Sequence, residues 1–474
     1  MGALAGALPS ILLALLLTST PEALGANPGL VARITDKGLE YAAQEGLLAL
    51  QSELLRIMLP DFTGDVRIPH VGRGSYEFRS LNIHSCELRH SALRPVPGQG
   101  LSLSISDSFI RVQGRWKVRK SFLKLQGSFD VSVKGISISV NLLLGSESSG
   151  RPTVTASSCS SNIDDVEVDM SGDLGAGELT QAFSFRVFQI CEMIQKSVSS
   201  DLQPYLQTLP VTTEIDSFAG IDYSLVEAPR ATAQMLEVMF KGEIFHRNHR
   251  APVTLLAPVM SLPEEHNKMV YFALSDYVFN TASLVYHKEG YLNFSITDDM
   301  IPPDSNIRLT TKSFRPFVPR LARLYPNMNL ELQGSVPSAP LLNFSPGNLS
   351  VNPYMEIDAF VLLPSSSKEP VFRLSVATNV SAILTFNTSK ITGFLKPGKV
   401  KVELKESKVG LFNAELLEAL LNYYILNNLY PKFNDKLAEG FPLPLLKHVQ
   451  LYDLGLQIHK DFLFLGANVQ YMRV

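Results

Sequence analysis

The sequence predicts an α+β fold of two similar elongated units that share a central sheet. In each half, a helical pattern, a run of short alternating segments and a longer helical pattern follow in the same order. The helix starts are offset by 275 − 36 = 239 and 413 − 178 = 235 residues, which indicates two diverged copies of one unit. The segments that follow the long helices, LPVTTEIDSFAGIDYSL and LPLLKHVQLYDLGLQIH, are predicted to pair across the middle of the molecule.

A secretory signal is predicted at the start of the chain, over residues 1–25. The opening stretch MGALAGALPSILLALLLTSTPEALGA holds one apolar run from Ile11 to Leu17 and ends in small residues. A run this short is typical of a cleaved signal and does not span a bilayer. We therefore expect a secreted, extracellular protein whose mature chain begins at Ala26.

Two helical patterns frame the first half. The first follows Thr35-Asp36, an expected N-cap, and ends at Leu59-Pro60; its apolar face holds Leu39, Ala43, Leu47, Leu50, Leu54 and Ile57. The second closes at Leu209-Pro210, and its apolar face holds Leu179, Phe183, Val187, Ile190, Ile194, Val198 and Leu202. The long stretch between them alternates in short segments broken by Gly, Pro and Ser, which predicts antiparallel strands.

The stretch RVQGRWKVRKSFLKLQGSFDVSVK, residues 111–134, predicts a β-hairpin. Up to Arg119, cations fall on one parity, and the apolar residues and the single tryptophan fall on the other. From Leu123 the apolar parity is shifted by one residue, which indicates a turn near 119–122. One face is therefore predicted to be cationic, with the side chains of Arg111, Arg115, Lys117, Arg119 and Lys124, and Lys120 adds a second cation at the tip beside Arg119. Such a face either keeps an exposed edge soluble or binds an anion.

Basic residues concentrate around this hairpin. The whole chain has 42 Lys and Arg against 45 Asp and Glu, a formal net charge of −3. Residues 66–134 hold 12 basic and 4 acidic residues, a local charge of 12 − 4 = +8. A basic segment in a mildly acidic chain favours a local anion site over general adhesion to nucleic acid or membranes. Arg67, Arg73 and Arg79 lie in this segment, but the sequence does not place them beside the hairpin.

The second half repeats the helix signals. Ser275 is expected to cap a helix that ends at Gly290, with Val278, Ala282, Val285 and Tyr286 on its inner face. Strands with Pro-rich loops follow. Asn413 is expected to cap a longer helix that runs to Gly440 with a kink at Pro431, and its inner face holds Leu417, Leu420, Leu421 and Tyr424.

Cysteines and glycosylation motifs fit an extracellular protein. The three cysteines, Cys86, Cys159 and Cys191, indicate one disulfide and one free thiol, and their spacing leaves the pairing open. N-x-[ST] sequons all fall in the second half, at Asn293, Asn343, Asn348, Asn379 and Asn387. Glycans need exposed backbone, so this half should present much of its surface to solvent.

Signals for an enzyme or a metal site are weak. His246 and His249 stand as H-R-N-H, and Glu264-Glu265-His266 resembles a loop, without H-E-x-x-H or paired cysteines. The chain has no G-x-S-x-G motif, and Gly175 and Gly177 lack the third glycine of a nucleotide loop. We interpret the histidines as surface or linker residues. We expect no catalytic residues, no metal and no cofactor.

Four long stretches match a known pattern. They are NPGLVARITDKGLEYAAQEG, RWKVRKSFLKLQGSFDVSVKGISISVNLLL, SSCSSNIDDVEVDMSGDLG and LNYYILNNLYPKFNDKLAEGFPLPLLKHVQLYDLGLQIHKDFLFLGANVQYMRV. Through them the chain resembles, over almost its whole length, the family of bactericidal/permeability-increasing protein and the plasma lipid-transfer proteins. The resemblance implies a boomerang of two barrels, each a strongly twisted antiparallel sheet wrapped on a long helix, joined by a central sheet. It also implies an apolar pocket for phospholipid in each barrel.

The resemblance implies a function as well. A secreted plasma protein of innate immunity and the acute phase would bind the lipid A part of bacterial lipopolysaccharide and transfer monomers to a myeloid cell coreceptor. The hairpin cations would bind the phosphates of lipid A, and Phe122 would lie against sugar or acyl carbon. Delivery to the coreceptor would use the C-terminal half. The protein would bind no nucleic acid and would not be transmembrane.

The resemblance also implies domains and a disulfide. The N-terminal lipid-binding barrel with its basic tip would span 26–209, a linker and central-sheet segment 210–240, and the glycosylated C-terminal barrel 241–474. The family pattern, together with the location of the cysteines, implies that Cys159 pairs with Cys191. Cys86 would be a buried free thiol on a strand.

Two other functions in the family remain as alternatives, and one segment departs from the pattern. A bactericidal membrane disruptor should be strongly basic, whereas the pI of this chain is about 6.3. General phospholipid transfer is the second alternative. A shuttle for neutral lipids is disfavoured, because such a protein should end in an amphipathic helix, whereas this sequence ends in the strand-like LFLGANVQYMRV. Residues 175–189, GAGELTQAFSFRVFQ, differ from the longer amphipathic helix that the family pattern implies at this place. The segment is expected to be about two turns shorter than in the family, which removes roughly 10 Å of helix.

Overall fold

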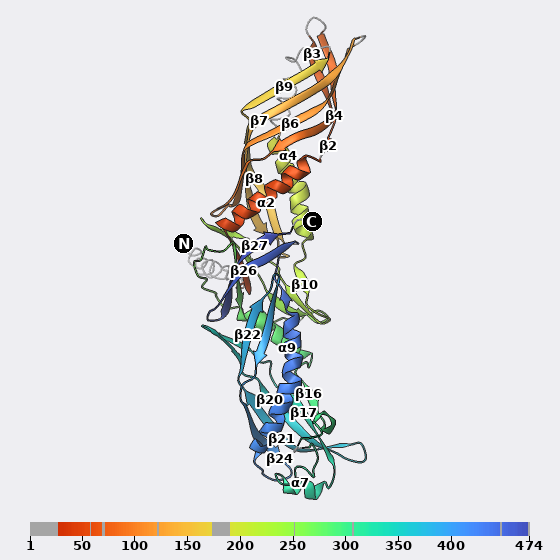
Figure 1. Ribbon diagram of the computed structural model, residues 1–474, viewed down its shortest axis with the longest axis vertical. Coiled ribbons are helices and arrows are strands. Elements are labelled where there is room, and N and C mark those ends of the chain that lie inside the picture. Colours follow the sequence, from red (N-terminus) through yellow and green to blue (C-terminus); the bar gives the residue numbers. More distant parts are fainter. Residues whose placement is uncertain are drawn as a thin grey trace, which may run out of the picture.

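The computed structural model describes residues 27–56, 58–68, 72–120, 123–172, 190–250, 252–305, 308–445 and 448–472. The molecule is elongated, with one unit of strands and helices at each end and a central sheet between them (Figure 1). The predicted α+β class and two-unit architecture are thereby confirmed. The predicted signal, the atypical segment 175–189 and Phe122 lie outside the described residues.

The first unit is one eight-stranded antiparallel sheet with helices packed against it. The main path of the sheet is β2-β4-β6-β7-β8, with β3 beside β4, β5 beside β6 and β9 beside β7. The strands are β2 (Met58–Leu59), β3 (Phe62–Ile68), β4 (Gly72–Glu87), β5 (His90–Val96), β6 (Gly100–Lys120), β7 (Leu123–Ser146), β8 (Pro152–Asn162) and β9 (Asp165–Gly172). The helices are α2 (Asp36–Leu54), against β5 and β4, and the series α4 (Ile190–Ser197), η1 (Val198–Leu202) and α5 (Gln203–Thr208), against β8.

The second unit divides its strands between two five-stranded sheets, β16-β17-β20-β21-β24 and β18-β19-β22-β23-β25. The strands are β16 (Phe294–Ile296), β17 (Asn329–Ser335), β18 (Leu342–Ser345), β19 (Asn348–Val351), β20 (Tyr354–Leu362), β21 (Lys368–Thr378), β22 (Val380–Phe386), β23 (Lys390–Lys396), β24 (Val400–Ser407) and β25 (Phe441–Pro442). The helices are α6 (Asp276–Lys288), η2 (Asp298–Met300), α7 (Pro319–Leu324), η3 (Ala414–Leu417), α8 (Glu418–Tyr424), η4 (Ile425–Leu429) and α9 (Tyr430–Glu439).

The central sheet joins strands from distant parts of the chain. Its order is β12 (Arg230–Ala231), β13 (Met235–Phe240), β1 (Leu30–Thr35), β15 (Val270–Ser275), β27 (Phe462–Tyr471) and β26 (Val449–Ile458). β1 pairs with β13 on one side and with β15 on the other. The sheet therefore ties the start of the described chain to its middle and to its end.

The predicted pairing of the two trailing segments is wrong. The segment after the first long helix forms β10 (Thr212–Glu214) and β11 (Ala219–Asp222), which pair with each other, and β11 also pairs with β14 (Glu243–His246) in a separate three-stranded sheet. Asp216 closes the turn between β10 and β11, because its Oδ1 accepts hydrogen bonds from the backbone N–H groups of Phe218 and Ala219. The backbone N–H and C=O groups of this segment are thus hydrogen-bonded within the three-stranded sheet. Strands β13 and β1, rather than this segment, lie in the middle of the central sheet.

A π-helical segment precedes a proline in each long helix. In the first unit, η1 leads into α5, which has Pro204 in its first turn; in the second unit, η4 leads into α9, which has Pro431 in its first turn. Proline lacks the N–H of the helical ladder, and its ring crowds the carbonyl four residues earlier. A wider turn relieves this crowding. The departure from α geometry thus falls next to Pro431, where a kink was predicted.

Helices start directly after Thr35, Ser275 and Asn413, as predicted, but the hydroxyls of Thr35 and Ser275 form hydrogen bonds away from their helices. Asn413 caps its helix as predicted, with Oδ1 accepting a hydrogen bond from Glu415 N at 3.0 Å. Ser275 stands at the N-cap of α6, but its hydroxyl donates to Gly29 O at 3.1 Å. The hydroxyl of Thr35 donates to Lys268 O at 2.8 Å. Each of these two hydroxyls ends a central strand, so each supports the sheet rather than a helix.

The core of the first unit confirms the inward parity of the hairpin. Trp116 and Val118 on β6 are buried, and Phe129 and Val131 on β7 are buried against them. Phe78 joins this cluster from β4, with its ring 5.2 Å from that of Phe129. Burying each such aromatic side chain stabilises the fold by roughly 1.5–3 kcal/mol.

The predicted disulfide is confirmed. Cys159 on β8 is bonded to Cys191 on α4, with 5.5 Å between their Cα atoms. Closing a loop with a sequence separation of 32 residues stabilises a fold by about 3–4 kcal/mol in the chain-entropy model. Cys86 is free and buried on β4, as predicted, and burial raises the pKa of its thiol.

An ionic cluster around the buried carboxylate of Glu237 joins strands of the central sheet. Arg33 on β1 donates from Nε and Nη2 to Glu237 Oε1 at 3.0 and 2.7 Å, and Arg230 on β12 donates from Nη2 to Oε2 at 2.6 Å. Arg33 Nη1 also donates to Pro263 O at 2.6 Å. Burial by itself would raise the pKa of Glu237, but the hydrogen bonds from Arg230 and Arg33 lower it below its ordinary value. The carboxylate therefore stays charged and joins three segments.

We predict that Glu237→Gln lowers the free energy of unfolding by about 3–5 kcal/mol, because it leaves the buried Arg33 guanidinium without its counter-charge. Urea denaturation followed by circular dichroism measures the change. Glu227→Gln, at an exposed position in the preceding loop, serves as the matched control and should stay within about 0.5 kcal/mol of the parent. An equal, small effect of both substitutions would contradict a structural role for the cluster.

Candidate functional site

The far end of the first unit carries the predicted cationic face. β6 and β7 pair in one register from Ile110 and Val133 to Lys120 and Leu123, and residues 121–122 lie outside the described residues. Arg115 and Arg119 are exposed and Lys117 is half-buried, on the parity opposite to the buried Trp116. Figure 1 shows this end of the sheet projecting away from the rest of the molecule. The face and its position at the hairpin end agree with the sequence.

The structure also places the arginines that the sequence left unplaced. On β4, Arg79 lies directly opposite Arg115 in register, and Ser75 lies opposite Arg119. Directly opposite residues of antiparallel strands share a face, so Arg79 belongs to the cationic face. Arg73 pairs with Arg67 of β3, two residues beyond Ser75 toward the hairpin end. Only cross-strand register reveals this grouping, and local alternation carries no such signal.

The hairpin cations differ in how they are paired. Arg111 donates from Nε to Asp130 Oδ1 at 2.7 Å, and that hydrogen bond raises the pKa of the Arg111 guanidinium and lowers the pKa of Asp130. Arg111 also lies about 26 Å along the strand from Arg119, at roughly 3.3 Å per residue. In the part of the chain that the structure describes, the cations nearer the tip form no ion pair: Arg115, Lys117, Arg119 and Lys124.

These geometric facts define what the face can bind. Unpaired guanidinium and ammonium groups on one surface offer charge-assisted donors to phosphate or carboxylate oxygens, and arginine can donate in a bidentate manner. A polar hollow of about 490 Å³ adjoins the face and includes Arg115, Asn82 and Gln113 in its lining. The exposed cations nearer the tip, rather than Arg111, therefore form the stronger anion site. The side chain of Lys120 lies outside the described residues.

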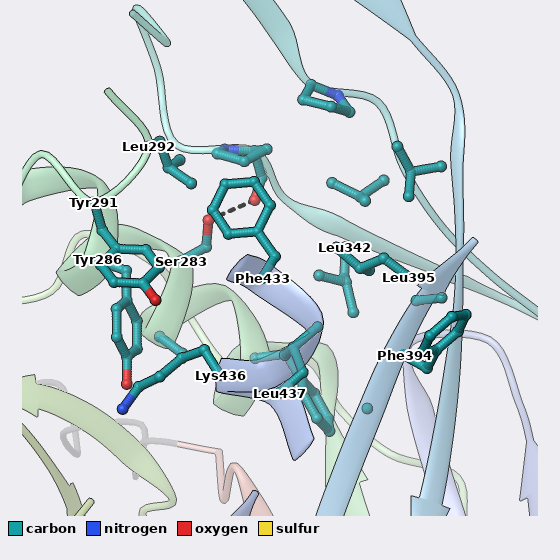
Figure 2. Close-up of a pocket in the computed structure, with 18 of the residues that line it drawn as sticks. Ser283, Tyr286, Tyr291, Leu292, Leu342, Phe394, Leu395, Phe433, Lys436 and Leu437 are labelled. Carbon is teal, nitrogen blue, oxygen red and sulfur yellow. Dashed lines mark hydrogen bonds between the residues drawn. The ribbon is translucent and has the colours of Figure 1, made fainter. Parts of the chain in front are cut away.

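A second candidate site is an apolar cavity of about 280 Å³ in the second unit. Helix α6 contributes Phe279, Ala282, Ser283 and Tyr286, helix α9 contributes Phe433, Lys436 and Leu437, and the strands contribute Leu342, Ala382, Leu384, Phe394 and Leu395. Figure 2 shows Tyr286, Tyr291 and Lys436 on one side of the cavity, and Leu342, Leu395 and Phe394 on the other. The lining is suited to hydrocarbon, with polar groups gathered at one side.

Those polar groups form a connected network. Lys436 Nζ lies 2.9 Å from Asp216 Oδ2 and 2.6 Å from Glu439 Oε2, and the hydroxyl of Tyr286 donates to Asp216 Oδ2 at 2.7 Å. Burial would raise the pKa of Asp216, but hydrogen bonds from Lys436 and Tyr286 lower it. Burial and the hydrogen bond to Asp216 raise the pKa of the Tyr286 hydroxyl. No local sequence signal joins Asp216 to Lys436, because α9 follows the β10–β11 turn only after most of the second unit.

The histidine cluster is not a metal centre in the described ranges. They contain no group of three or more His, Cys, Asp or Glu side chains that could hold a metal ion. The interpretation of His246 as a surface or linker residue is wrong, because it ends β14 and is only 7 % exposed. Its Nδ1 accepts hydrogen bonds from the backbone N–H groups of Asn248 and His249, so it closes a turn.

Two further surface features bear on the sequence predictions. All five sequon asparagines are exposed: Asn293, Asn343, Asn348, Asn379 and Asn387. Across the described residues, no helix combines the length and the apolar character that a membrane span requires.

Comparison with known proteins places these sites in context. Residues 38–209 match the N-terminal domain, and residues 213–471 the C-terminal domain, of the LBP / BPI / CETP family. Human lipopolysaccharide-binding protein is 92% identical over 482 aligned positions that cover 100% of both chains, and the bovine protein is 72% identical over 99% of both. Rat bactericidal permeability-increasing protein is 39% identical over 97% of both chains. A crystal structure of lipopolysaccharide binding protein superposes with a TM-score of 0.64 at 64% identity, covering 94% of this chain and 100% of that chain.

We predict that Asp216→Asn lowers the free energy of unfolding at neutral pH by about 1–3 kcal/mol, because charged hydrogen bonds to Lys436 and Tyr286 are lost. The pKa of Asp216 is lowered in the folded state from its ordinary 3.8. Its contribution is therefore fully present above that value and disappears as the pH falls through the folded pKa. Denaturation of both proteins between neutral and acidic pH tests this.

The matched control for this experiment is Glu214→Gln, since Glu214 is exposed and pairs with Arg247 at the surface. It should change stability by less than about 1 kcal/mol. A deficit of Asp216→Asn that stays constant at every pH would refute the charge-based explanation.

Proposed function

We propose that this chain, which belongs to the LBP / BPI / CETP family, binds bacterial lipopolysaccharide and carries it as monomers in the extracellular fluid. The observation that carries this proposal is the cationic hairpin end, where Arg115, Lys117, Arg119 and Lys124 form no ion pair among the described residues. Identities of 92% and 72% to human and bovine lipopolysaccharide-binding protein support it. Family members are lipid-binding proteins, and the chain is not an enzyme.

The proposed ligand contact follows from the chemistry of lipid A. Lipid A carries phosphates on an acylated disaccharide, so its polar end is anionic and its other end is hydrocarbon. Arg119 and Arg115 would donate to the phosphates, with Lys117, Lys124 and Lys120 adding charge. Phe122 would lie against sugar or acyl carbon. Arg79 extends the same face, although its Nη2 already donates to Glu77 Oε1 at 2.5 Å.

Phospholipid is the proposed occupant of an apolar pocket in each unit. The cavity of about 280 Å³ between α6, α9 and the β22–β23 pair supports this for the second unit. In the first unit, large apolar side chains of the helices and the sheet are left exposed, and acyl chains would cover them: Leu48, Leu50, Leu143 and Leu202. Unbound, such surface is costly in water, at roughly 25 cal/mol per Å².

The remaining assignments are proposals about the whole molecule. Residues 1–25 would direct secretion, 26–209 would form the lipid-binding unit, 210–240 the linker and 241–474 the glycosylated unit that meets a myeloid cell coreceptor. Exposure of all five sequon asparagines in the second unit supports its glycosylation. The bridge between Cys159 and Cys191 fits an oxidising extracellular compartment.

A bactericidal membrane disruptor is the weaker alternative. Disruption of anionic membranes favours a strongly basic protein, and this chain has a formal net charge of −3 with its basic residues concentrated locally. General phospholipid transfer would need the apolar pockets but not an unpaired cationic end. The cationic end therefore favours the proposed function over both alternatives.

We predict that the double substitution Arg119→Glu and Lys120→Glu reduces lipopolysaccharide binding at least tenfold while the protein still folds and is secreted. Exposed tip cations contribute only about 0–1 kcal/mol to stability. Binding of fluorescent lipopolysaccharide, measured as a titration, quantifies the loss. The control pair Arg89→Glu and Arg94→Glu changes charge equally at the opposite end of the same sheet. Normal binding by the tip variant, or equal loss in the control, would refute the assigned site.

We also predict that Ala382→Phe, which fills the cavity of the second unit, removes about one phospholipid per chain from the roughly two that solvent extraction should release. Ser381→Phe is the matched control, because the neighbouring side chain on β22 is exposed and points to the other face. Native mass spectrometry counts bound lipid in each protein. Equal lipid content in both variants, or none in the parent after incubation with vesicles, would contradict the pocket assignment.

A further inference from the structure

The end of the second unit presents exposed leucines. Leu411, in the loop between β24 and η3, is 96 % exposed, and Leu324, at the end of α7, is 53 % exposed. Figure 1 shows α7 at the extreme end of the molecule, opposite the cationic hairpin. The loop before Leu411 lies against α7, since a Cβ added at Gly410 would stand 3.7 Å from Arg320 Cδ. The two leucines therefore belong to one convex end.

The same end is cationic. From Asn306 to Leu330 the sequence has five basic residues and no acidic residue: Arg308, Lys312, Arg315, Arg320 and Arg323. Arg308 is used internally, because it donates to Asp298 Oδ2 at 2.7 Å and to backbone carbonyls. The other four side chains are exposed and form no ion pair among the residues that the structure describes. We define the distal tip as Lys312, Arg315, Arg320, Arg323, Leu324 and Leu411.

The loop that carries Leu411 is held in place by its neighbours. Val409 is buried with Val318 and Leu321 in the core of the second unit, and the ring of Phe412 packs 5.0 Å from that of Phe372. Lys408 N donates to Val371 O at 2.9 Å, and Ser407 Oγ donates to Gly410 O at 2.6 Å. Val409 and Phe412 pack inward on either side of the turn, whereas the large apolar side chain of Leu411 is almost fully exposed. Folding alone does not account for that arrangement.

We propose that the distal tip docks on an anionic phospholipid surface. Leucine side chains that enter the boundary of a lipid layer gain burial, and adjacent Lys and Arg side chains pair with anionic headgroups. The unpaired cations and the protruding leucines supply both contributions. A protein partner fits less well, because a standard interface buries about 800 Å² on each side, and a convex end with two leucines presents no such face.

Vesicle flotation tests the proposal. The parent protein carries Arg119→Glu and Lys120→Glu, so that the hairpin end does not contribute, and phosphatidylcholine vesicles are used with and without phosphatidylserine. The parent should float with the anionic vesicles, and Arg320→Glu with Arg323→Glu should weaken partitioning by at least about tenfold. The control, Lys399→Glu with Lys401→Glu at the other end of β24, should weaken it less than about threefold. No flotation of the parent, or equal loss in both variants, would overturn the proposal.

Insertion of the leucine is tested by fluorescence. Leu411→Trp introduces an indole at the tip, against the constant background of Trp116, which is 2 % exposed. Its emission should shift to the blue on addition of vesicles that contain phosphatidylserine. Leu341→Trp, at an exposed position before β18, should show no shift. An unshifted Leu411→Trp spectrum with vesicles in excess would overturn insertion, even where flotation persisted.

Discussion

The architecture depends on the position of β1 between β13 and β15. These three strands come from the start of the described chain and from either side of residue 250, so their pairing is possible only once both units have been brought together. The Arg33–Glu237–Arg230 cluster fixes that pairing with a buried charge, and the hydroxyls of Thr35 and Ser275 bind carbonyls across the same joint. Because α2 and α6 begin directly after β1 and β15, the joint also sets where both units start.

This central constraint separates the chemically different surfaces. The long strands β6 and β7 carry cations that form no ion pair among the described residues, far from the joint, while the apolar cavity between α6 and α9 lies closer to it. The Asp216–Lys436 pair links the β10–β11 turn to the helix beside the cavity. A cavity that is bounded by parts of the joint is therefore coupled to the packing of the units, whereas the exposed cations of the hairpin end can vary without disturbing either core.

Local patterns in the sequence predicted much of this structure, but they did not predict contacts between residues that are remote in the chain. Alternation located the hairpin and turned Trp116 inward, because a strand's parity depends only on neighbouring residues. The Cys159–Cys191 bridge required the family pattern, since spacing left the pairing open. Parity could not show that Arg79 faces Arg115, that Asp216 meets Lys436 or that His246 is buried, because each depends on partners remote in the chain. The expected pairing of the trailing segments failed for the same reason.

The π-helical segments before Pro204 and Pro431 set the angle at which the side chains of the following helices face the sheet. A π turn holds one residue more than the α ladder would, so the helix beyond it is rotated by about 100° relative to an uninterrupted α-helix. Loss of one residue from η1 or η4 would restore the α ladder and leave the downstream apolar residues facing as before, whereas loss of one residue from an α-helical stretch would turn them by about 100°. A single-residue deletion is thus compatible with the buried stripe at η1 and η4, whereas in the α-helical stretches only a change of whole turns keeps that stripe aligned.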